Sequence, residues 1–269
     1  MGNKKLAILG SGNIGIAIAE GLVQSQLYDI ADIQMTKRNL NSASELMKNG
    51  FNVSSDNLDA VEKSDIIILA VQPKQLRALL NEISDKLNPT KSLVSVVTGV
   101  GLSAMQEIVG DSIPLYRAMP NTAISIQQSI TCIATHYQDE ERKKEIVNIF
   151  DNLGRAVVIE EELMASATVL GACGVAYALR FIRAASQGGI EIGFDADIAQ
   201  LITSQTVVGA ASLLLSTGKH PEREIDKVTT PQGCTIAGLN EMEHQGFSSA
   251  LIKGLKTSYN KISTIAKEE

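Results

Sequence analysis

The sequence predicts an α/β protein, with a doubly wound parallel sheet in its N-terminal part and an all-α part after it. Short apolar runs alternate with helical patterns through the first 160 of the 269 residues, and no strand pattern alternates with helices from about residue 161 onward. Alternating strands and helices are typical of a parallel sheet that helices cover on both faces. We therefore expect two domains, residues 1–160 and residues 161–269, each with a modest core.

The expected strands are short apolar runs bounded by polar or turn-forming residues. In chain order they are residues 6–9, 33–35, 66–71, 93–97, 115–119, 130–135 and 156–159. The run from Ile66 to Val71 is apolar throughout, which suits a strand that is buried on both faces.

Helical patterns fill the segments between these runs. They lie at residues 13–26, after residue 42, at 76–87, after residue 103 and at about 139–153. Ser42-x-x-Glu45 and Ser103-x-x-Gln106 are capping-box patterns, which predict that helices begin at those serines. Gly50 stands where a left-handed residue would end the first of these two helices.

The C-terminal part reads as a bundle of apolar helices. Residues 161–217 are rich in Ala, Leu, Ile, Val and Gly and carry few charges. A glycine inside a helix costs about 1 kcal/mol, so we expect these glycines to form turns or to let helices approach closely. They are Gly171, Gly174, Gly188, Gly189, Gly193 and Gly209. A monomer cannot easily bury so much apolar helix, which predicts a homodimer interface.

The composition excludes several classes of protein. With 44% hydrophobic and 20% charged residues the chain is neither disordered nor fibrous, and its net charge of −6 argues against nucleic-acid binding. The odd number of cysteines, at 132, 173 and 234, fits a reducing cytoplasm, and their spacing predicts no metal site. The apolar run at 6–9 is too short for an export signal, and no run reaches the roughly 18 apolar residues of a membrane span. We expect a cytoplasmic protein without a membrane partner.

A glycine-rich turn follows the first expected strand. Leu9 is followed by Gly10-Ser11-Gly12-Asn13-Ile14-Gly15, a G-x-G-x-x-G sequence between a strand and a helix. The first glycine of such a motif permits the tight turn, the second lets the backbone approach a pyrophosphate, and the third allows close packing of the helix on the strand. The N–H groups at the helix start bind the phosphates. The motif predicts an N-terminal Rossmann-type domain that binds a dinucleotide.

The end of the second expected strand indicates which dinucleotide binds. An acidic residue there would bind the ribose 2′-hydroxyl of NAD. The chain instead has Thr36-Lys37-Arg38, and Asp32 lies before the strand, where it cannot take this role. A hydroxyl and two cations suit a 2′-phosphate, because a guanidinium pairs well with phosphate. We therefore expect NADPH as the cofactor, with NADH as the open alternative.

Further turn-forming segments complete the expected site. The carboxyl ends of later strands form the walls of a dinucleotide site, and here they are Ala70-Val71-Gln72-Pro73, Val96-Val97-Thr98-Gly99 and Met119-Pro120-Asn121-Thr122. Later in the chain, Thr229-Thr230-Pro231-Gln232-Gly233-Cys234-Thr235 leads into a helix, whose exposed N–H groups can hold a carboxylate. Taken singly, each segment is also explained as an ordinary strand-ending turn or as a helix start that a threonine caps.

Taken together, these segments resemble the pyrroline-5-carboxylate reductase family over nearly the whole chain. The motifs that carry the resemblance are GSGNIG at 10–15, AVQP at 70–73, TGV at 98–100, RAMPNT at 117–122 and TTPQGCTIAGL at 229–239. The family reduces the C=N bond of 1-pyrroline-5-carboxylate to give L-proline, the last step of proline biosynthesis. The resemblance implies hydride transfer from NADPH to the imine carbon, and an all-α C-terminal dimerisation domain that some members assemble into rings of dimers.

The resemblance also implies roles for individual residues. Thr235 would orient the substrate with its hydroxyl and serve as a proton partner, while the N–H groups of Gly233, Cys234 and Thr235 would bind the substrate carboxylate beside Thr230. Asn57 is assigned to the cofactor site by spacing alone. The expected cofactor-binding residues are Leu9, Gly10, Ser11, Gly12, Asn13, Ile14, Thr36, Lys37, Arg38, Asn57, Ala70, Val71, Gln72, Pro73, Val96, Val97 and Thr98.

Two departures from the family's pattern keep other functions open. Gln232 replaces a glycine of the family's loop, and residues 171–175 lack two hydroxyls and a proline. A reductase of another cyclic imine therefore stays an alternative, and so does a nucleotide-sensing dimer without catalysis. A β-hydroxyacid dehydrogenase has a similar layout, but residues 169–183 lack the lysine that it would use as an acid.

Overall fold

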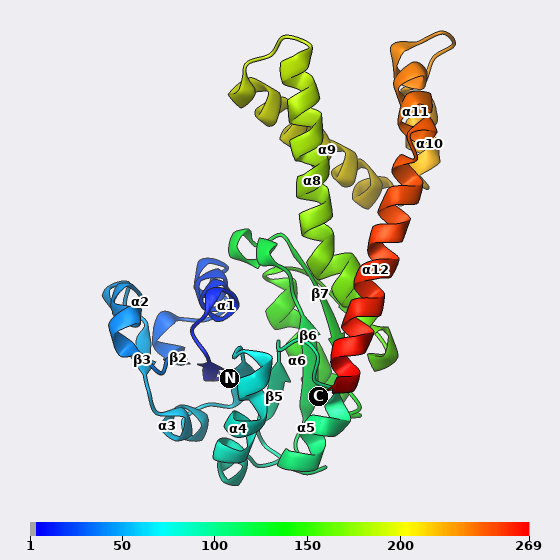
Figure 1. The fold of residues 1–269 in the computed structure, drawn as a ribbon. Helices are drawn as coiled ribbons and strands as arrows, with labels where there is room; N and C mark the ends of the chain where they lie inside the picture. Colours follow the sequence, from blue (N-terminus) through cyan, green and yellow to red (C-terminus); the bar gives the residue numbers. More distant parts are fainter. Residues whose placement is uncertain (1–3, 269) are drawn as a thin grey trace. The chain divides into compact units, whose positions relative to one another are not determined.

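The computed structural model describes residues 4–268, with side chains described as far as residue 262, and it divides into two compact units (Figure 1). The first unit comprises the chain up to Cys173 together with the segment from Tyr259 onward, and the second comprises Gly174–Ser258. The first unit contains the sheet, and the second consists of helices. The first unit thus continues beyond residue 160, and the expected domain boundary at 160 stays a prediction.

An eight-stranded sheet organises the first unit. Its strands are β1 (Leu6–Leu9), β2 (Ile33–Thr36), β3 (Asn52–Ser54), β4 (Ile66–Leu69), β5 (Ser92–Ser95), β6 (Leu115–Met119), β7 (Ser129–Ala134) and β8 (Gly154–Val158). They lie in the order β3-β2-β1-β4-β5-β6-β7-β8, and every neighbouring pair is parallel except β6 and β7. The predicted doubly wound α/β fold is confirmed, with β7 and β8 running opposite to the other strands.

The inner strands of this sheet are buried on both faces, as β1 shows. In β1 the side chains of Leu6 and Ile8 enter one core cluster, and those of Ala7 and Leu9 enter the other. Successive side chains of a strand point to opposite faces, so an apolar run without alternation suits this position. Helices α1 (Asn13–Gln24), α2 (Ser44–Lys48) and α6 (Glu140–Asp151) supply the first cluster, and α3 (Asn57–Glu62), α4 (Pro73–Ile83) and α5 (Leu102–Val109) supply the second.

The sequence pattern did not indicate β3 or α3, and both are short. Strand β3 has three residues, of which only Val53 is buried, so it carries no apolar run. Helix α3 begins after Asp56, whose side chain accepts a hydrogen bond from the N–H of Asp59 at 3.0 Å. These two elements add the outermost strand and a helix beside it.

Both capping-box predictions are wrong. Near Ser42 the chain forms a 3-10 turn from Leu40 to Ala43 before α2, and the cap is Asn39, whose side chain accepts from the N–H of Asn41 at 3.1 Å. The predicted end of this helix is confirmed, since Gly50 has a positive φ of 94°.

At α5 a distant carboxylate replaces the expected serine cap. The N–H of Leu102 donates to Glu161 Oε1 at 2.6 Å, and the same oxygen accepts from Arg117 Nη1 at 2.9 Å. His136 Nε2 lies 3.2 Å from the other carboxylate oxygen. Because Glu161 is 59 residues from Leu102, no local pattern could have indicated this cap.

The second unit confirms the all-α prediction for the residues that the structure describes there. It contains α8 (Gly174–Glu191), α9 (Ala196–Thr217), α10 (Pro221–Lys227), α11 (Cys234–His244) and most of α12 (Phe247–Glu268). A Cβ at Gly189 would lie 3.0 Å from the Cβ of Ala199, so this glycine allows α8 and α9 to pack closely. Gly193 forms the turn between them with a φ of 112°. Short α7 (Met164–Ala167) and a π-helical turn (Thr168–Cys173) precede this unit.

Tyr116, in β6, is fully buried, and its hydroxyl has no hydrogen-bond partner among the described residues. Burial raises the pKa of Tyr116 above its usual value. An unfolded tyrosine loses its proton near pH 10. Above that pH the unfolded chain is therefore deprotonated at this residue while the folded protein is not, so stability falls as pH rises.

We expect Tyr116→Phe to stabilise the protein by about 1 kcal/mol at pH 7, because it removes an unsatisfied buried hydroxyl. The advantage should grow by up to about 1.4 kcal/mol for each pH unit above 10, since the variant has no proton to lose there. Urea unfolding of both proteins from pH 7 to pH 11 measures the difference. A constant difference across this range would contradict the assignment.

Candidate functional site

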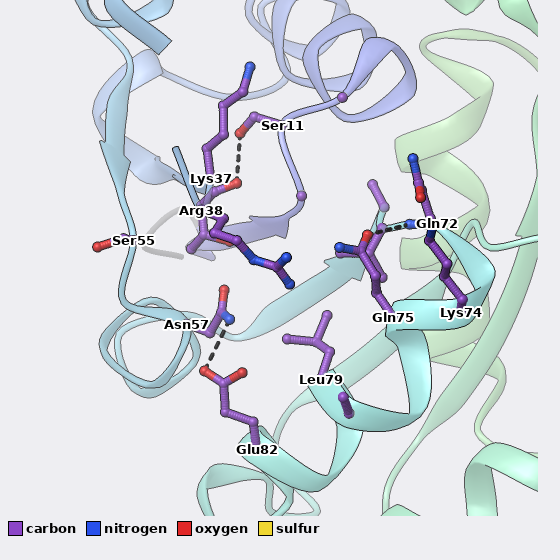
Figure 2. A pocket seen from close by; sticks show the side chains of 16 residues that line it. Ser11, Lys37, Arg38, Ser55, Asn57, Gln72, Lys74, Gln75, Leu79 and Glu82 are labelled. Carbon is purple, nitrogen blue, oxygen red and sulfur yellow. Dashed lines mark hydrogen bonds between the residues drawn. The ribbon is translucent and has the colours of Figure 1, made fainter. Parts of the chain in front are cut away.

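A cavity of about 640 Å³ opens where four neighbouring strands of the first unit end (Figure 2). Gly10, Lys37, Ser55 and Ala70 directly follow β1, β2, β3 and β4, and all four residues line it. Ligands of open α/β sheets bind outside the carboxyl ends of the strands. The cavity therefore lies where this fold places its ligand.

The glycine-rich turn forms one end of the cavity. Gly10 has a φ of 105°, and a Cβ there would lie 2.7 Å from the carbonyl oxygen of Ala70. A Cβ at Gly15 would overlap the carbonyl oxygen of Gly10. Gly12, in contrast, has open space where its Cβ would be. It is the residue before α1, and no side chain caps the start of this helix. The open N–H groups at this helix start fit a phosphate.

The turn is held against the end of β2. The N–H and the hydroxyl of Ser11 both donate to the carbonyl oxygen of Thr36, each at 2.9 Å. Ser11 and Thr36 are buried, although both line the cavity. These bonds hold the glycine-rich turn next to the loop after β2. The sequence assigned the first to the pyrophosphate and the second to the 2′-phosphate.

The two cations after β2 differ in what they contact. Lys37 Nζ donates to the carbonyl oxygen of Ser42 at 3.1 Å. Figure 2 shows the Arg38 side chain extending into the cavity towards α4, whereas Lys37 extends away from it. Within residues 4–262 the guanidinium of Arg38 has no hydrogen bond or ion pair to another side chain. Arg38 is therefore the cation that the geometry makes available to a 2′-phosphate.

The structure brings together ten of the seventeen residues expected to bind the cofactor. They are Gly10, Ser11, Gly12, Thr36, Lys37, Arg38, Asn57, Ala70, Val71 and Gln72. The other seven, Leu9, Asn13, Ile14, Pro73, Val96, Val97 and Thr98, do not line this cavity. Leu9 and Val97 are buried in the core, and Pro73 lines a separate cavity of about 390 Å³ between α4 and α5. The cofactor-binding role of all seventeen stays a prediction.

One face of α4 was missed as part of this site. Gln75, Ala78, Leu79 and Glu82 line the cavity, and they recur every three to four residues. This spacing places them on one face of a helix. The sequence pattern predicted a helix at 76–87 and assigned none of these four residues to the site. The signal that could have found the cavity face is the position of α4 directly after the AVQP segment.

The expected substrate loop belongs to the second unit and forms a tight turn. The N–H of Gly233 donates to the carbonyl oxygen of Thr230 at 2.9 Å. Gln232 has a φ of 58°, a left-handed conformation that favours glycine. Gly233 precedes α11 without a side-chain cap, so the first N–H groups of this helix, beginning at Cys234, are open. The hydroxyl of Thr235 has no hydrogen-bond partner among the described residues. These features fit a carboxylate-binding loop.

Comparison with known proteins decides the family. Residues 161–265 match the family model for pyrroline-5-carboxylate reductase dimerisation, and residues 5–99 match the model for NADP oxidoreductase, coenzyme F420-dependent. The chain is 43% identical to pyrroline-5-carboxylate reductase 2 of Dictyostelium discoideum, over 97% of this chain and 93% of that protein. The chain belongs to the pyrroline-5-carboxylate reductase family.

Two further similarities agree with this assignment. The chain is 46% identical to pyrroline-5-carboxylate reductase 1 of Dictyostelium discoideum, over 97% of its own length but only 49% of that protein, so it spans about half of this relative. The solved structure of a pyrroline-5-carboxylate reductase from Coxiella burnetii has a TM-score of 0.90 at 26% identity, and the match covers 98% of both chains. The resemblance expected from the sequence motifs is confirmed.

We expect Arg38→Ala to weaken NADPH binding by about tenfold or more while leaving NADH binding nearly unchanged, because only NADPH carries the 2′-phosphate. Titration of the purified protein with each nucleotide measures both dissociation constants. Lys63→Ala is the control, since that ammonium group pairs with the Asp59 carboxylate at 2.7 Å and lies outside the cavity lining, and it should leave both dissociation constants unchanged. Equal losses for the two nucleotides in Arg38→Ala would remove Arg38 from this role.

Proposed function

We propose that the protein reduces 1-pyrroline-5-carboxylate to L-proline with NADPH, the last step of proline biosynthesis. The observation that carries this proposal is the cavity at the carboxyl ends of the strands. There the open start of α1 and the guanidinium of Arg38, which has no partner within residues 4–262, offer two separate anion sites. A dinucleotide with a 2′-phosphate has charges that match both. Membership of the family supplies the substrate class and the reaction.

The reaction needs positioning more than it needs strong acids or bases. Bound NADPH supplies the hydride that the imine carbon accepts. A protonated C=N bond is already electrophilic, so the protein mainly has to orient it and keep it in place. Among the described residues no group of three His, Cys, Asp or Glu lies close enough together to hold a metal ion.

The loop before α11 provides the substrate contacts in this proposal. The open N–H groups of Cys234 and Thr235 bind the substrate carboxylate in this proposal. The N–H of Gly233, which the resemblance also assigns to the carboxylate, donates to the carbonyl oxygen of Thr230 at 2.9 Å and holds the turn beside them. The hydroxyl of Thr235 orients the ring and acts as proton partner of the ring nitrogen. Support comes from the uncapped start of α11 and from the match of this loop to the family's motif.

Homodimer formation through the C-terminal helices is part of the same proposal. The dimerisation model matches residues 161–265, and many large apolar side chains of α8 and α9 are exposed, such as Leu179 at 58% and Leu201 at 64%. By length and composition alone, Glu161–Glu191 and Ala196–Thr217 would also be long and apolar enough to cross a membrane. We assign this surface to a second copy of the chain.

The proposal also includes four further statements. They are assembly into a larger ring, a cytoplasmic location, the absence of nucleic-acid and membrane partners, and the division of the chain into domains at residue 160.

Reduction of another cyclic imine is the second candidate, and one structural observation favours it. Residues 171–175, where the chain departs from the family's pattern, span the end of the π-helical turn and the start of α8. Backbone in this form is frequent at functional sites. In this second candidate, the altered residues at 171–175 let the substrate site accept a different imine ring.

A spectrophotometric assay tests the reaction directly. We expect purified protein to consume NADPH when 1-pyrroline-5-carboxylate is added, with L-proline as the product. Consumption with a six-membered cyclic imine at a higher kcat/KM would favour the second candidate. NADPH binding without consumption of any cyclic imine would favour the nucleotide-sensing dimer.

We expect Thr235→Ala to lower kcat/KM for the imine by about ten- to a hundredfold, because an orienting group and proton partner is lost. NADPH affinity should not change. Thr235→Ser, which keeps the hydroxyl, should retain most of the activity. Thr229→Ala is the control, since the Thr229 hydroxyl donates to the carbonyl oxygen of Ile225 at 2.7 Å. Turnover of Thr235→Ala at the wild-type level would show that the hydroxyl is not needed.

A further inference from the structure

The two ends of the cavity differ in their hydrogen-bonding groups. The near end, at the glycine-rich turn, offers N–H donors, and the far end, at Glu82 and Asn57, offers oxygen acceptors. Glu82 lies near the end of α4, ten residues after Gln72, which places it about 15 Å along the helix from Gln72. Asn57, the first residue of α3, lines the cavity at the same end. Leu79 lies one turn before Glu82 and gives this part of the wall an apolar surface.

A hydrogen bond joins the two polar residues. Asn57 Nδ2 donates to Glu82 Oε1 at 3.1 Å, and Figure 2 shows the two side chains facing each other beside the cavity. This bond uses the amide as donor, so Asn57 Oδ1 stays an acceptor. A carboxylate accepts up to about four hydrogen bonds, and within residues 4–262 Glu82 receives no other. The far end of the cavity thus offers several acceptor positions, on Glu82 and on Asn57 Oδ1, against the one remaining N–H of the Asn57 amide.

The order of groups along the cavity matches the order of groups in an adenine dinucleotide. Phosphate fits the start of α1, and a 2′-phosphate fits Arg38, which extends across the cavity towards α4. A base attached to that ribose would reach the α4 wall, where Leu79 and Glu82 line the cavity. Adenine presents an exocyclic amino group, which is a hydrogen-bond donor. Hypoxanthine and guanine present a carbonyl oxygen at the same position.

We propose that Glu82, oriented by its hydrogen bond from Asn57, recognises the exocyclic amino group of adenine and so determines which base the site accepts. This inference rests on the proposed use of NADPH, and it adds base selectivity, which the proposed reaction does not require. The carboxylate accepts from the amino group, and it repels a carbonyl oxygen placed there.

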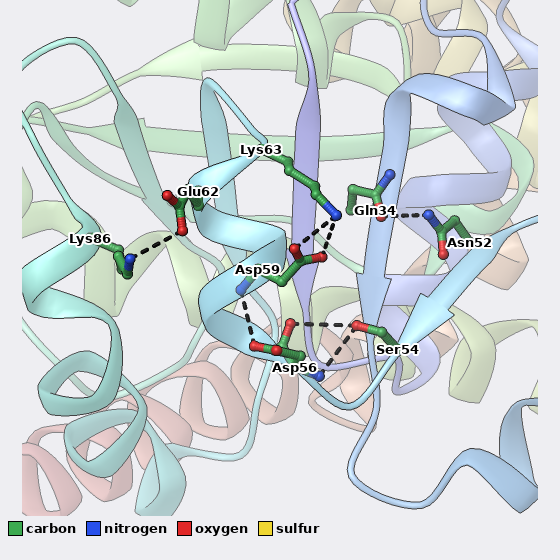
Figure 3. A network of polar contacts seen from close by, with 8 residues as sticks. All are labelled: Gln34, Asn52, Ser54, Asp56, Asp59, Glu62, Lys63 and Lys86. Carbon is green, nitrogen blue, oxygen red and sulfur yellow. Dashed lines mark hydrogen bonds and ion pairs between the residues drawn. The ribbon is translucent and has the colours of Figure 1, made fainter.

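A purely structural role for this bond makes a different prediction. The Asn57–Glu82 bond would then only join α3 to α4, and its loss would weaken every nucleotide alike. The chain offers a matched control in the pair of Glu62 and Lys86, whose Oε2 and Nζ atoms lie 3.1 Å apart (Figure 3). This pair joins α3 to the 3-10 turn Ser84–Lys86 that directly follows α4, but it does not line the cavity.

The experiment compares NADPH with its deaminated analogue, nicotinamide hypoxanthine dinucleotide phosphate, in which a carbonyl oxygen replaces the amino group. Dissociation constants are measured by fluorescence titration of the protein without substrate. We expect the wild-type protein to prefer NADPH by about tenfold, as the gain of one charge-assisted hydrogen bond allows. Glu82→Ala should reduce this preference to about one, and Glu62→Ala should leave it unchanged.

Glu82→Gln keeps the acceptor for Asn57 and adds an amide donor. We expect it to bind the deaminated analogue at least as tightly as NADPH, which a loss of folding could not produce.

Equal affinity of the wild-type protein for the two nucleotides would overturn the inference, and so would an unchanged preference in both Glu82 variants. Base selectivity without turnover of 1-pyrroline-5-carboxylate would count against the proposed substrate alone. Turnover without base selectivity would count against this inference alone.

Discussion

The close approach of backbone to backbone after β1 is the constraint on which the cofactor site depends. Gly10 lies against the carbonyl group of Ala70, and Gly15 lies against that of Gly10, so neither position has room for a side chain. This approach brings the end of β1 next to the end of β4 and leaves the start of α1 open. It also lets Ser11 reach the last carbonyl oxygen of β2. Contacts within one short turn thereby align three strand ends around a single cavity.

The sequence predicted the parts of the structure that have strong local causes. A strand buried on both faces must be apolar throughout, so the run at 66–71 could be recognised without knowledge of its neighbours. The glycine-rich turn could be recognised for the same reason. Strand β3 was missed because three residues with one buried side chain carry no pattern. The α4 wall of the cavity was missed because its polar members look like any solvated helix face.

Tertiary partners overrode local signals at several places. The carboxylate of Glu161 serves the N–H of Leu102, the guanidinium of Arg117 and the imidazole of His136, which lie on three separate segments. Glu161 is also where the chain leaves the sheet for the helical segment. One carboxylate thus caps a helix and fixes the course of the chain after β8. A capping box pairs two residues three positions apart. At α5 the N–H group is instead bound by the Glu161 carboxylate, which Arg117 also holds in place.

The helices of the second unit have almost no interior of their own. Among its described side chains only Ser186 and Ala199 are buried, although α8 and α9 are mostly apolar. The hydrophobic effect can stabilise these helices only when another surface covers them. In the homodimer that we propose, a second copy supplies this surface, so the helical unit gains a core only on assembly. The stability of the helical unit then depends on protein concentration, so dilution should destabilise it as a mild denaturant would.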